Sequence, residues 1–412
     1  MFSIALSIFV ITYIGIALGE IPFLQLDRTG IALLGAILMI VFGVLSIDQI
    51  NSAVDLPTLF LLYSLMIISA QLRLGGFYTW LIFKMTPYVK KPFLFLGLSM
   101  LVSAILSAIL ANDIICLAFT PIMTVSVLQA RMNPVPFLLG LALSSNIGSA
   151  STIIGNPQNM LIGQIGKLNF LHFILWCLPP ALISLFFSYG VLCFVYRNRF
   201  TATTSLKDPI TKESWPTFDR DQTFKGLLAV GLLIILFFTS YPRELTAIGI
   251  AGVLICSRKF KSRHILGLID WPLITLFFAL FVLIQGIENV HLPQKIAIFL
   301  RTHEISIQQP FILVTISAFL SNLVSNVPAV MLLLQFLNPE NPTEYYILAT
   351  ASTFAGNFIL IGSIANLIVV EQASLYGVSI SFKEHAKVGV PITLGTLLFL
   401  FLYIGLLGFI QG

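Results

Sequence analysis

Asparagine, serine and threonine residues are concentrated in the middle of an otherwise apolar stretch, SSNIGSASTIIGNPQNMLIG, at residues 144–163. With its apolar flanks, the segment is long enough to cross a bilayer. Unpaired backbone groups are costly in hydrocarbon, so a run of glycine, proline and asparagine is tolerated there only where it is buried in protein or lines a cavity. The pattern predicts a helix that is broken near the middle of the membrane and presents amide and hydroxyl groups to a solute. The alternative is a kinked helix whose serines and threonines only help helices to pack.

A second stretch repeats this pattern. STFAGNFILIGSIAN (352–366) aligns without a gap on SNIGSASTIIGNPQN (145–159), which pairs Gly155 with Gly362 and Asn159 with Asn366. In the same way LVSAILSAILAND (101–113) aligns with VTISAFLSNLVSNV (314–327), and Asn112 pairs with Asn326. Two unrelated kinked helices would not share a register, so the repeat favours broken helices, and internal repeats in a membrane chain are typical of secondary transporters.

The composition places the whole chain in a membrane. Apolar residues make up 58% of the chain and charged residues only 9%, against roughly 25% charged in soluble domains. The net charge of +5 belongs to loops that flank membrane segments, so we expect no nucleic-acid partner. The four cysteines fall in apolar segments without metal-like spacing, and the first segment lacks the basic start of a signal peptide, so we interpret it as a retained helix.

We therefore expect an all-α polytopic membrane protein with two inverted-topology repeats, about ten crossings and two re-entrant helical hairpins. The first repeat covers 1–196, a cytoplasmic linker covers 197–223, and the second repeat covers 224–412. The hairpins are predicted at 93–128 and 309–338, and the broken helices at 135–164 and 344–372. The remaining spans are predicted at 2–19, 30–47, 57–72, 169–196, 224–240, 245–257, 271–287 and 388–410, with amphipathic segments at 74–87 and 290–302.

The distribution of basic residues supports this topology. Most Lys and Arg residues fall in loops that the arrangement places on one side, and only Lys167, Arg243, Lys295 and Arg301 fall on the other. The positive-inside rule assigns the basic side to the cytoplasm. We expect an integral protein of the bacterial inner (cell) membrane, surrounded by lipid, with both termini outside.

The candidate site residues lie at the interruptions. Asp113 is the only ionisable residue that the prediction places deep in the membrane, where a carboxylate suits exchange of a proton for sodium or for a protonated solute. The alternative is a protonated Asp that only bonds across helices. The other candidates carry amide, hydroxyl or exposed backbone groups, and are Asn112, Asn146, Ser149, Thr152, Gly155, Asn156, Asn159, Ser325, Asn326, Thr353, Asn357, Gly362, Ser363 and Asn366.

Amide groups both donate and accept hydrogen bonds, so these residues suit a neutral hydroxylated solute, or an oxyanion held by amides and helix N-termini. No Arg or Lys is predicted at the midplane, which favours a neutral or weakly charged substrate. No phosphate-binding glycine loop, nucleophile elbow or zinc spacing occurs, so we expect neither an enzyme nor a cofactor beyond Na⁺ or H⁺ as coupling ion. An intramembrane enzyme is a remote alternative, because Asp113 has no predicted partner acid or histidine.

Two motifs resemble those of a known superfamily. ANDIICLAFTPI (111–122) is similar to the arsenite permease pattern, and IGNPQN (154–159) is similar to silicon-efflux and NhaD-like carriers. The chain thus resembles the ion transporter superfamily, which also includes the divalent anion/sodium symporters. The resemblance implies hairpin tips that face the unwound loops, sodium near Asn112 and Asn326, an elevator-type movement against a scaffold, and a homodimer. The chain departs from the symporter signature, because Ala111, Asp113 and Val327 replace its Ser and Thr residues.

Residues and resemblance together predict a secondary active transporter of a small anion or a metalloid oxyacid, similar to arsenite or silicate, coupled to H⁺ or Na⁺. Sodium-coupled anion or dicarboxylate symport is one alternative, and Na⁺/H⁺ antiport is another.

Overall fold

The computed structural model describes residues 1–19, 25–201 and 215–411. Helices are the regular secondary structure of the described part, apart from one isolated antiparallel bridge between Met132 and Thr201. The all-α prediction is therefore confirmed. Most of the predicted linker, at 202–214, lies outside the described residues.

The two halves of the chain follow the same order of helices. The first half contains α1 (Phe2–Leu18), α2 (Arg28–Val41), α3 (Ile47–Ala53), α4 (Leu56–Leu74), α5 (Phe77–Met85), η1 (Thr86–Tyr88), α6 (Pro92–Leu110), α7 (Asn112–Gln129), α8 (Val135–Ser149), α9 (Pro157–Ile165) and α10 (Phe170–Tyr196). The second half contains α11 (Arg220–Phe237), α12 (Arg243–Ile255), α13 (Ser262–Leu266), α14 (Trp271–Asn289), α15 (Leu292–Thr302), α16 (Pro310–Val324), α17 (Asn326–Leu333), η2 (Leu334–Phe336), α18 (Pro342–Ala355), η3 (Leu360–Gly362), α19 (Ile364–Ser374) and α20 (Phe382–Gln411). The inverted orientation of the halves and the re-entrant placement of their hairpins stay predictions.

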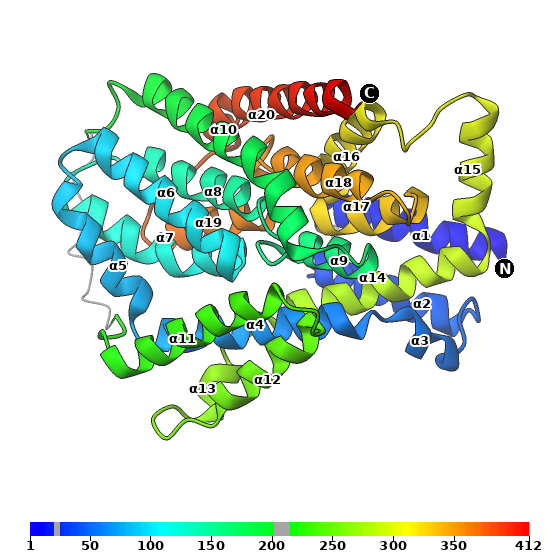
Figure 1. The fold of residues 1–412 in the computed structure, drawn as a ribbon, viewed down its shortest axis with the longest axis horizontal. Coiled ribbons are helices and arrows are strands. Elements are labelled where there is room, and N and C mark those ends of the chain that lie inside the picture. Colours follow the sequence, from blue (N-terminus) through cyan, green and yellow to red (C-terminus); the bar gives the residue numbers. More distant parts are fainter. Residues whose placement is uncertain (20–24, 202–214, 412) are drawn as a thin grey trace.

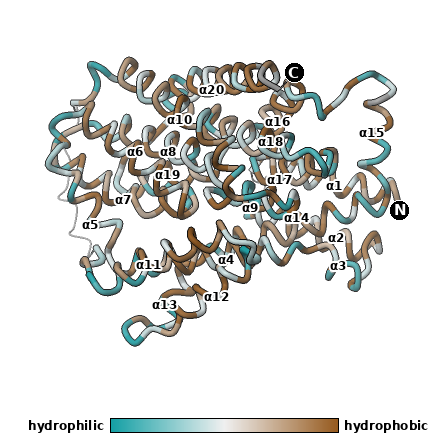
Figure 2. The backbone as a smooth tube through the Cα atoms, viewed as in Figure 1, coloured by the Kyte–Doolittle hydropathy of each residue, from teal (hydrophilic) through white to brown (hydrophobic). Residues whose placement is uncertain are grey.

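The predicted elements all occur near their predicted bounds, and the sequence did not indicate the short helices α3 and α13. Among the described residues, six helices are long and apolar enough to cross a membrane, namely α4, α6, α7, α10, α14 and α20. Figure 2 shows that apolar residues follow the helices, while many hydrophilic residues lie near helix ends and in connections.

Local chemistry fixes equivalent helix starts in the two halves. Asp55 precedes α4, and its carboxylate accepts a hydrogen bond from the Thr58 backbone N–H at 2.8 Å. Asp270 precedes α14 and accepts from the Leu273 backbone N–H at 3.0 Å. Both helices have proline in the first turn, where no intrahelical donor is needed. α4 and α14 are therefore equivalent elements of the two halves.

The helices form two groups around the breaks (Figure 1). In this view α4, α11 and α12 lie below a block that contains α6, α8, α10 and α20. Within the block α6 packs on α8, and α10 packs on α20. α6 and α8 approach closely at Gly148, where a Cβ would lie 2.3 Å from the Ala104 carbonyl oxygen. Small residues permit this backbone contact, as is usual between membrane helices.

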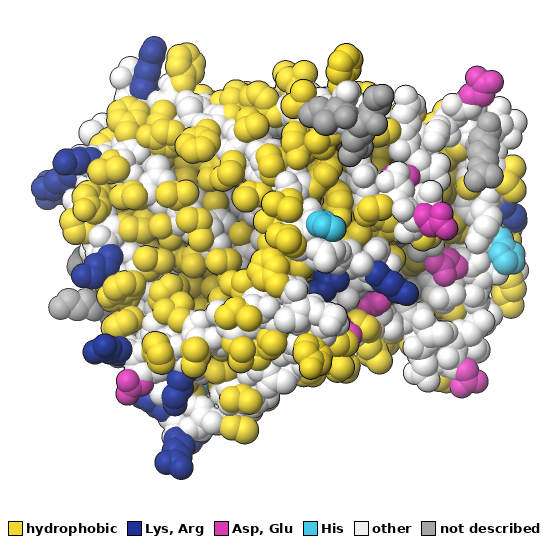
Figure 3. Space-filling view, in the orientation of Figure 1, with side chains coloured by type: hydrophobic (Ala, Val, Ile, Leu, Met, Phe, Trp, Pro, Cys, Tyr) yellow, Lys and Arg dark blue, Asp and Glu magenta, His cyan; other side chains and the backbone are white. Residues whose placement is uncertain are grey.

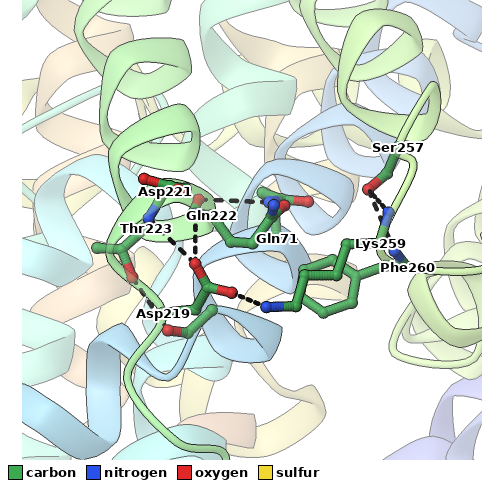
Figure 4. A network of polar contacts seen from close by, with 9 residues as sticks. Gln71, Asp219, Asp221, Gln222, Thr223, Ser257, Lys259 and Phe260 are labelled. Atoms are coloured by element: carbon green, nitrogen blue, oxygen red, sulfur yellow. Dashed lines mark hydrogen bonds and ion pairs between the residues drawn. The ribbon is translucent and has the colours of Figure 1, made fainter.

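A polar network joins the lower group near the end of α4 (Figure 4). The Gln71 amide donates to the Gln222 side-chain oxygen at 3.0 Å and to its backbone carbonyl at 3.3 Å. The Thr223 hydroxyl donates to the Gly75 carbonyl at 3.0 Å. Asp219 caps α11 and forms an ion pair with Lys259, in the loop after α12. These contacts fix α11 to α4 and to that loop.

The two ends of the molecule differ in charge. Figure 1 places both chain ends toward the right of the view. Figure 3 shows that Lys and Arg side chains on this face gather mainly toward the left end, whereas Asp and Glu side chains lie mainly toward the right. The basic end is therefore opposite the end that holds the termini.

Candidate functional site

The first kind of break reverses the backbone at a single non-glycine residue with positive φ. Between α6 and α7, Ala111 has φ 61° and ψ 131°. Between α16 and α17, Ser325 has φ 74° and ψ 162°. In each case an asparagine, Asn112 or Asn326, is the first residue of the next helix. Such a conformation is strained for a residue with a side chain and persists only where the surroundings enforce it, often at functional sites.

The second kind of break separates α8 from α9 and α18 from α19. The helix after each break starts from an extended residue, Asn156 with φ −153° and Ser363 with φ −134°. These two residues occupy the same position in the gapless sequence alignment. Unwound residues therefore separate α8 from α9 and α18 from α19, and that each pair forms one broken membrane helix, at 135–164 and 344–372, stays a prediction.

Equivalent asparagines stabilise the unwound loops at these breaks by donating hydrogen bonds to backbone carbonyl groups. Asn159 donates its amide to the carbonyl oxygens of Ser149 at 3.2 Å and Thr152 at 3.0 Å. Asn366 donates to the carbonyl oxygens of Gly356 at 2.9 Å and Ile359 at 3.4 Å. The accepting residues are again equivalent in the alignment. A helix that stops inside the protein leaves carbonyl groups without partners, and each asparagine supplies the missing donor.

Glycine is required in the first break for steric reasons. A Cβ on Gly155 would lie 2.1 Å from the Ser149 carbonyl oxygen, which belongs to the backbone and cannot move aside cheaply. The Gly155 carbonyl in turn accepts the backbone N–H of Asn112 at 2.9 Å. The turn between α6 and α7 is thereby attached to the unwound loop. At Gly362 a Cβ would lie 2.9 Å from the Asn322 side-chain oxygen.

Asn146 is the centre of the hydrogen-bond network. Its Oδ1 accepts from the amide of Asn112 at 2.9 Å and from the hydroxyl of Ser363 at 3.0 Å. Its Nδ2 donates to the Oδ1 atoms of Asn357 at 2.8 Å and Asn366 at 3.3 Å. One side chain, 1% exposed, therefore joins the turn after α6 to the unwound loop of the other half.

A second set of contacts joins the halves through Thr353. Its hydroxyl accepts from the amides of Asn156 at 3.2 Å and Gln158 at 3.3 Å. Asn156 also donates to the Ser149 hydroxyl at 3.0 Å. Asn326, with its amide oriented as its neighbours require, accepts from Gln158 at 3.3 Å. Gln158 was not among the predicted site residues, although the sequence places it inside the polar stretch.

The structure buries all of the predicted site residues and joins most of them. Thr152 contributes its backbone carbonyl to Asn159 and donates its hydroxyl to the Ala108 carbonyl. Gly155 and Gly362 contribute backbone. Two predicted residues, Asp113 and Ser325, take no part in the side-chain network. Asp113 instead lines a small cavity beside it.

Several buried oxygen atoms near the breaks have no hydrogen-bond partner among the described residues. They include the side-chain oxygens of Asn112, Asn159, Ser321 and Asn322. Such atoms are costly when they stay unpaired, so they indicate a place where a solute hydroxyl group or a water molecule could donate a hydrogen bond.

The cavity beside the network contains an acidic neighbour that the sequence did not reveal. It measures about 40 Å³ and is lined by Asp113, Asp270 and Arg73 among mostly apolar residues. The expectation that Asp113 has no partner acid is therefore wrong. Asp270 lies more than one hundred residues after Asp113 in the chain. Its sequence surroundings indicate only a helix cap, so the sequence did not indicate that the two carboxylates share a cavity.

Buried titratable groups also include two that the sequence did not place in the core. Glu344 accepts from the Asn338 backbone at 2.8 Å and the Asn341 amide at 3.0 Å. His385, in the first turn of α20, is 1% exposed, and neither ring nitrogen has a hydrogen-bond partner among the described residues. The predicted start of the last span at residue 388 left His385 in a loop, because the charged residues around it hide the start of α20.

Comparison with known proteins identifies the family. Residues 9–344 match the profile of the family CitMHS, described as citrate transporter. The chain is 28% identical to a silicon efflux transporter of Oryza sativa subsp. japonica, over 91% of this chain and 92% of the relative. It is 25% identical to a Dictyostelium discoideum protein named as transporter arsB, over 90% and 86%. It is also 25% identical to a 46 kDa membrane protein of Mycobacterium leprae, over 95% and 96%.

The profile covers most of the chain, and the apolar helices fit a bilayer. This chain is therefore an integral membrane transporter, not an enzyme, and it belongs to the citrate transporter (CitMHS) family of the ion transporter superfamily.

Proposed function

We propose that this protein is a secondary active transporter of a metalloid oxyacid or small anion, similar to arsenite or silicate, driven by H⁺ or Na⁺. The observation that carries the proposal is the buried network around Asn146, which joins the breaks of both halves through amide and hydroxyl groups. No Lys or Arg contributes to that network among the described residues. A neutral site with unpaired oxygens suits a solute that brings its own hydroxyl donors.

The network also supports a mechanism. In this conformation its side chains are buried, so a solute can enter only after the groups around it separate. The proposed transport domain contains the α6–α7 and α16–α17 pairs and both broken helices, and it moves in an elevator fashion against a scaffold that includes α4 and α14. The repeated helix order and the fixed attachment of α4 support this division.

We further propose two inverted repeats at 1–196 and 224–412, re-entrant hairpins at both Ala111 and Ser325, a homodimer formed through the scaffold, and termini outside a bacterial inner membrane. The charge difference between the two ends of the molecule supports this orientation. The name of the silicon efflux relative supports a hydroxylated substrate.

Sodium-coupled symport of citrate or a dicarboxylate is the second candidate, and the description of the matched family favours it. A multiply charged anion would need positive charge at the site, which the network itself does not offer. Sodium or the N-termini of α9 and α19 would have to offset that charge.

The test is transport by purified protein in proteoliposomes with an acidic interior and an internal pH dye. Arsenite, silicic acid, citrate and sulfate are each added with and without sodium, sodium is also added alone, and solute uptake is measured in parallel. Proton release from the vesicles with arsenite or silicic acid supports the proposal. Sodium-dependent citrate uptake without proton movement would replace it with symport, and proton release on sodium alone would replace it with Na⁺/H⁺ antiport.

A matched pair of variants connects the transport to the site. Thr353→Val removes the hydroxyl that accepts from Asn156 and Gln158, and we expect the apparent affinity for the transported solute to fall roughly fivefold, as for one lost hydrogen bond. Thr350→Val is the control, because its buried hydroxyl contacts only Cys177 and its own helix. Equal affinity in the two variants would place the solute elsewhere.

A further inference from the structure

The cavity beside the network lies between two groups of helices that the proposed mechanism moves past each other. Asp113, in the first turn of α7, and Ala111 come from the α6–α7 pair. Arg73, near the end of α4, and Asp270, which caps α14, come from the proposed scaffold. The volume of about 40 Å³ exceeds the space of one water molecule, for which roughly 10–15 Å³ suffices.

The carboxylate of Asp113 shares its cavity with Asp270 but has no hydrogen-bond donor or ion-pair partner among the described residues. The residue is 8% exposed. Asp270 accepts one hydrogen bond, from the Leu273 N–H. A buried carboxylate without a hydrogen-bond donor is costly. The unpaired side chain of Asp113 therefore indicates that a ligand occupies the cavity.

The charges of the cavity do not balance. Two carboxylates, Asp113 and Asp270, face one guanidinium, Arg73, and the other lining residues are apolar. α9 and α19 contribute Pro157, Met160 and Ile368 only, so no further charge comes from them. Two further titratable groups, Tyr78 and Cys116, lie within electrostatic range of Arg73 and Asp113 respectively, and neither lines the cavity. One negative charge is left over in apolar surroundings.

We propose that this cavity is the site of the coupling cation, in which one exchangeable H⁺ or Na⁺ binds between Asp113 and Asp270 beside Arg73; this inference rests on the proposed transport function. The cation neutralises the carboxylate that Arg73 leaves uncompensated. Movement of the α6–α7 turn past α4 and α14 separates Asp113 from Asp270, opens the site and releases the cation. Burial raises the pKa of the Asp270 carboxyl, which agrees with a site that can hold a proton.

A second cavity, lined by residues of both halves, lies against α14 as the first lies against α4, and it lacks two of these features. It measures about 280 Å³ and is lined by Asp55 and Glu288. When α4 is aligned with α14 without a gap so that the caps Asp55 and Asp270 pair, Glu288 pairs with Arg73. Its lining residues include no Lys or Arg among the described residues, and the alignment partner of Asp113 is Val327. The tip carboxylate is therefore present at the first cavity only, which assigns the coupling cation to that cavity.

The second cavity supplies a matched control. Asp113→Asn and Asp270→Asn remove one carboxylate each from the proposed site, and Asp55→Asn makes the same change in the other cavity. Asn caps a helix as well as Asp does, so both cap variants should keep their helices. The whole protein in lipid nanodiscs is examined by infrared spectroscopy, for a protonated carboxyl that titrates with pH, and by binding of radioactive sodium.

We expect the wild type to bind one cation per chain, seen as a titrating carboxyl if it is H⁺ and as saturable sodium binding if it is Na⁺. Asp113→Asn and Asp270→Asn should each abolish that signal, and Asp55→Asn should keep it. Arg73→Gln should bind the cation more tightly, because it removes the competing positive charge. An absent signal in the wild type, or one that survives in both Asp113→Asn and Asp270→Asn, overturns the inference.

Failure of the proposed function would look different. If the wild type shows the cation signal with this variant pattern but moves no tested solute in proteoliposomes, the cation site stands and the transport proposal falls. If the wild type transports with proton or sodium coupling and Asp270→Asn couples equally well, the transport proposal stands and the cation site falls.

Discussion

Replacement of Asn146 by alanine should destabilise the whole protein, because this side chain joins elements from both halves of the chain. The substitution removes four hydrogen bonds, to Asn112, Asn357, Ser363 and Asn366. It also leaves the partners of these bonds buried, without water to replace them. The only covalent change is the loss of the Asn146 amide group.

The magnitude follows from the count of bonds. Side-chain hydrogen bonds in membrane proteins average about 0.6 kcal/mol each, so four of them contribute about 2.4 kcal/mol. Because every 1.4 kcal/mol is a factor of ten, the unfolded fraction should rise about 50-fold. The cavity left by the missing amide increases the loss further.

The assay is reversible unfolding of the purified protein in mixed micelles, with the free energy of unfolding compared between variants. Ser188→Ala is the control, since its buried hydroxyl donates only to the Ser184 carbonyl of its own helix at 2.7 Å, and its loss should stay near 0.6 kcal/mol. If Asn146→Ala lowers the free energy of unfolding no more than Ser188→Ala does, the network does not hold the halves together and the reasoning is refuted.

Three further substitutions test other parts of the structure by the same unfolding assay. Ala111→Gly should raise the free energy of unfolding by about 0.5 kcal/mol, because relief of the positive φ exceeds the extra entropy of glycine, and a decrease would show that Ala111 is not strained. Gly155→Ala should lower it by about 1–3 kcal/mol, since the new Cβ meets the Ser149 carbonyl, while Gly190→Ala, with open space around it, should not. Burial raises the pKa of the Asp270 carboxyl in the folded protein. The protonated side chain therefore contributes its full stability below the pKa that Asp270 has in the unfolded chain, and this contribution is lost as the pH rises through its pKa in the folded protein. Asp270→Asn should therefore make the free energy of unfolding depend less steeply on pH above the ordinary aspartate range. If the variant keeps the pH dependence of the wild type, the raised pKa of Asp270 is not its cause.

The sequence by itself determined the helices, the breaks and the repeat. Apolar length decides where a chain can cross a bilayer, and Gly155, Asn156 and Pro157 cannot continue a helix there without internal partners. The pairing of Asn159 with Asn366 also came from sequence, because the two halves share one register, and their hydrogen bonds agree with it. These features are local, so the pattern of neighbouring residues is enough to predict them.

Only the tertiary structure decided which side chains meet. Asn146 contacts Asn357 and Asn366 from the far half of the chain, and Asp113 shares a cavity with Arg73 and Asp270. In a chain that is apolar throughout, hydrophobicity gives little information on which helix faces which, since lipid and protein neighbours are equally apolar. Lateral packing selects the partners, by close backbone contact and by the need to pair every buried polar group, and both conditions exist only once all the helices are in place.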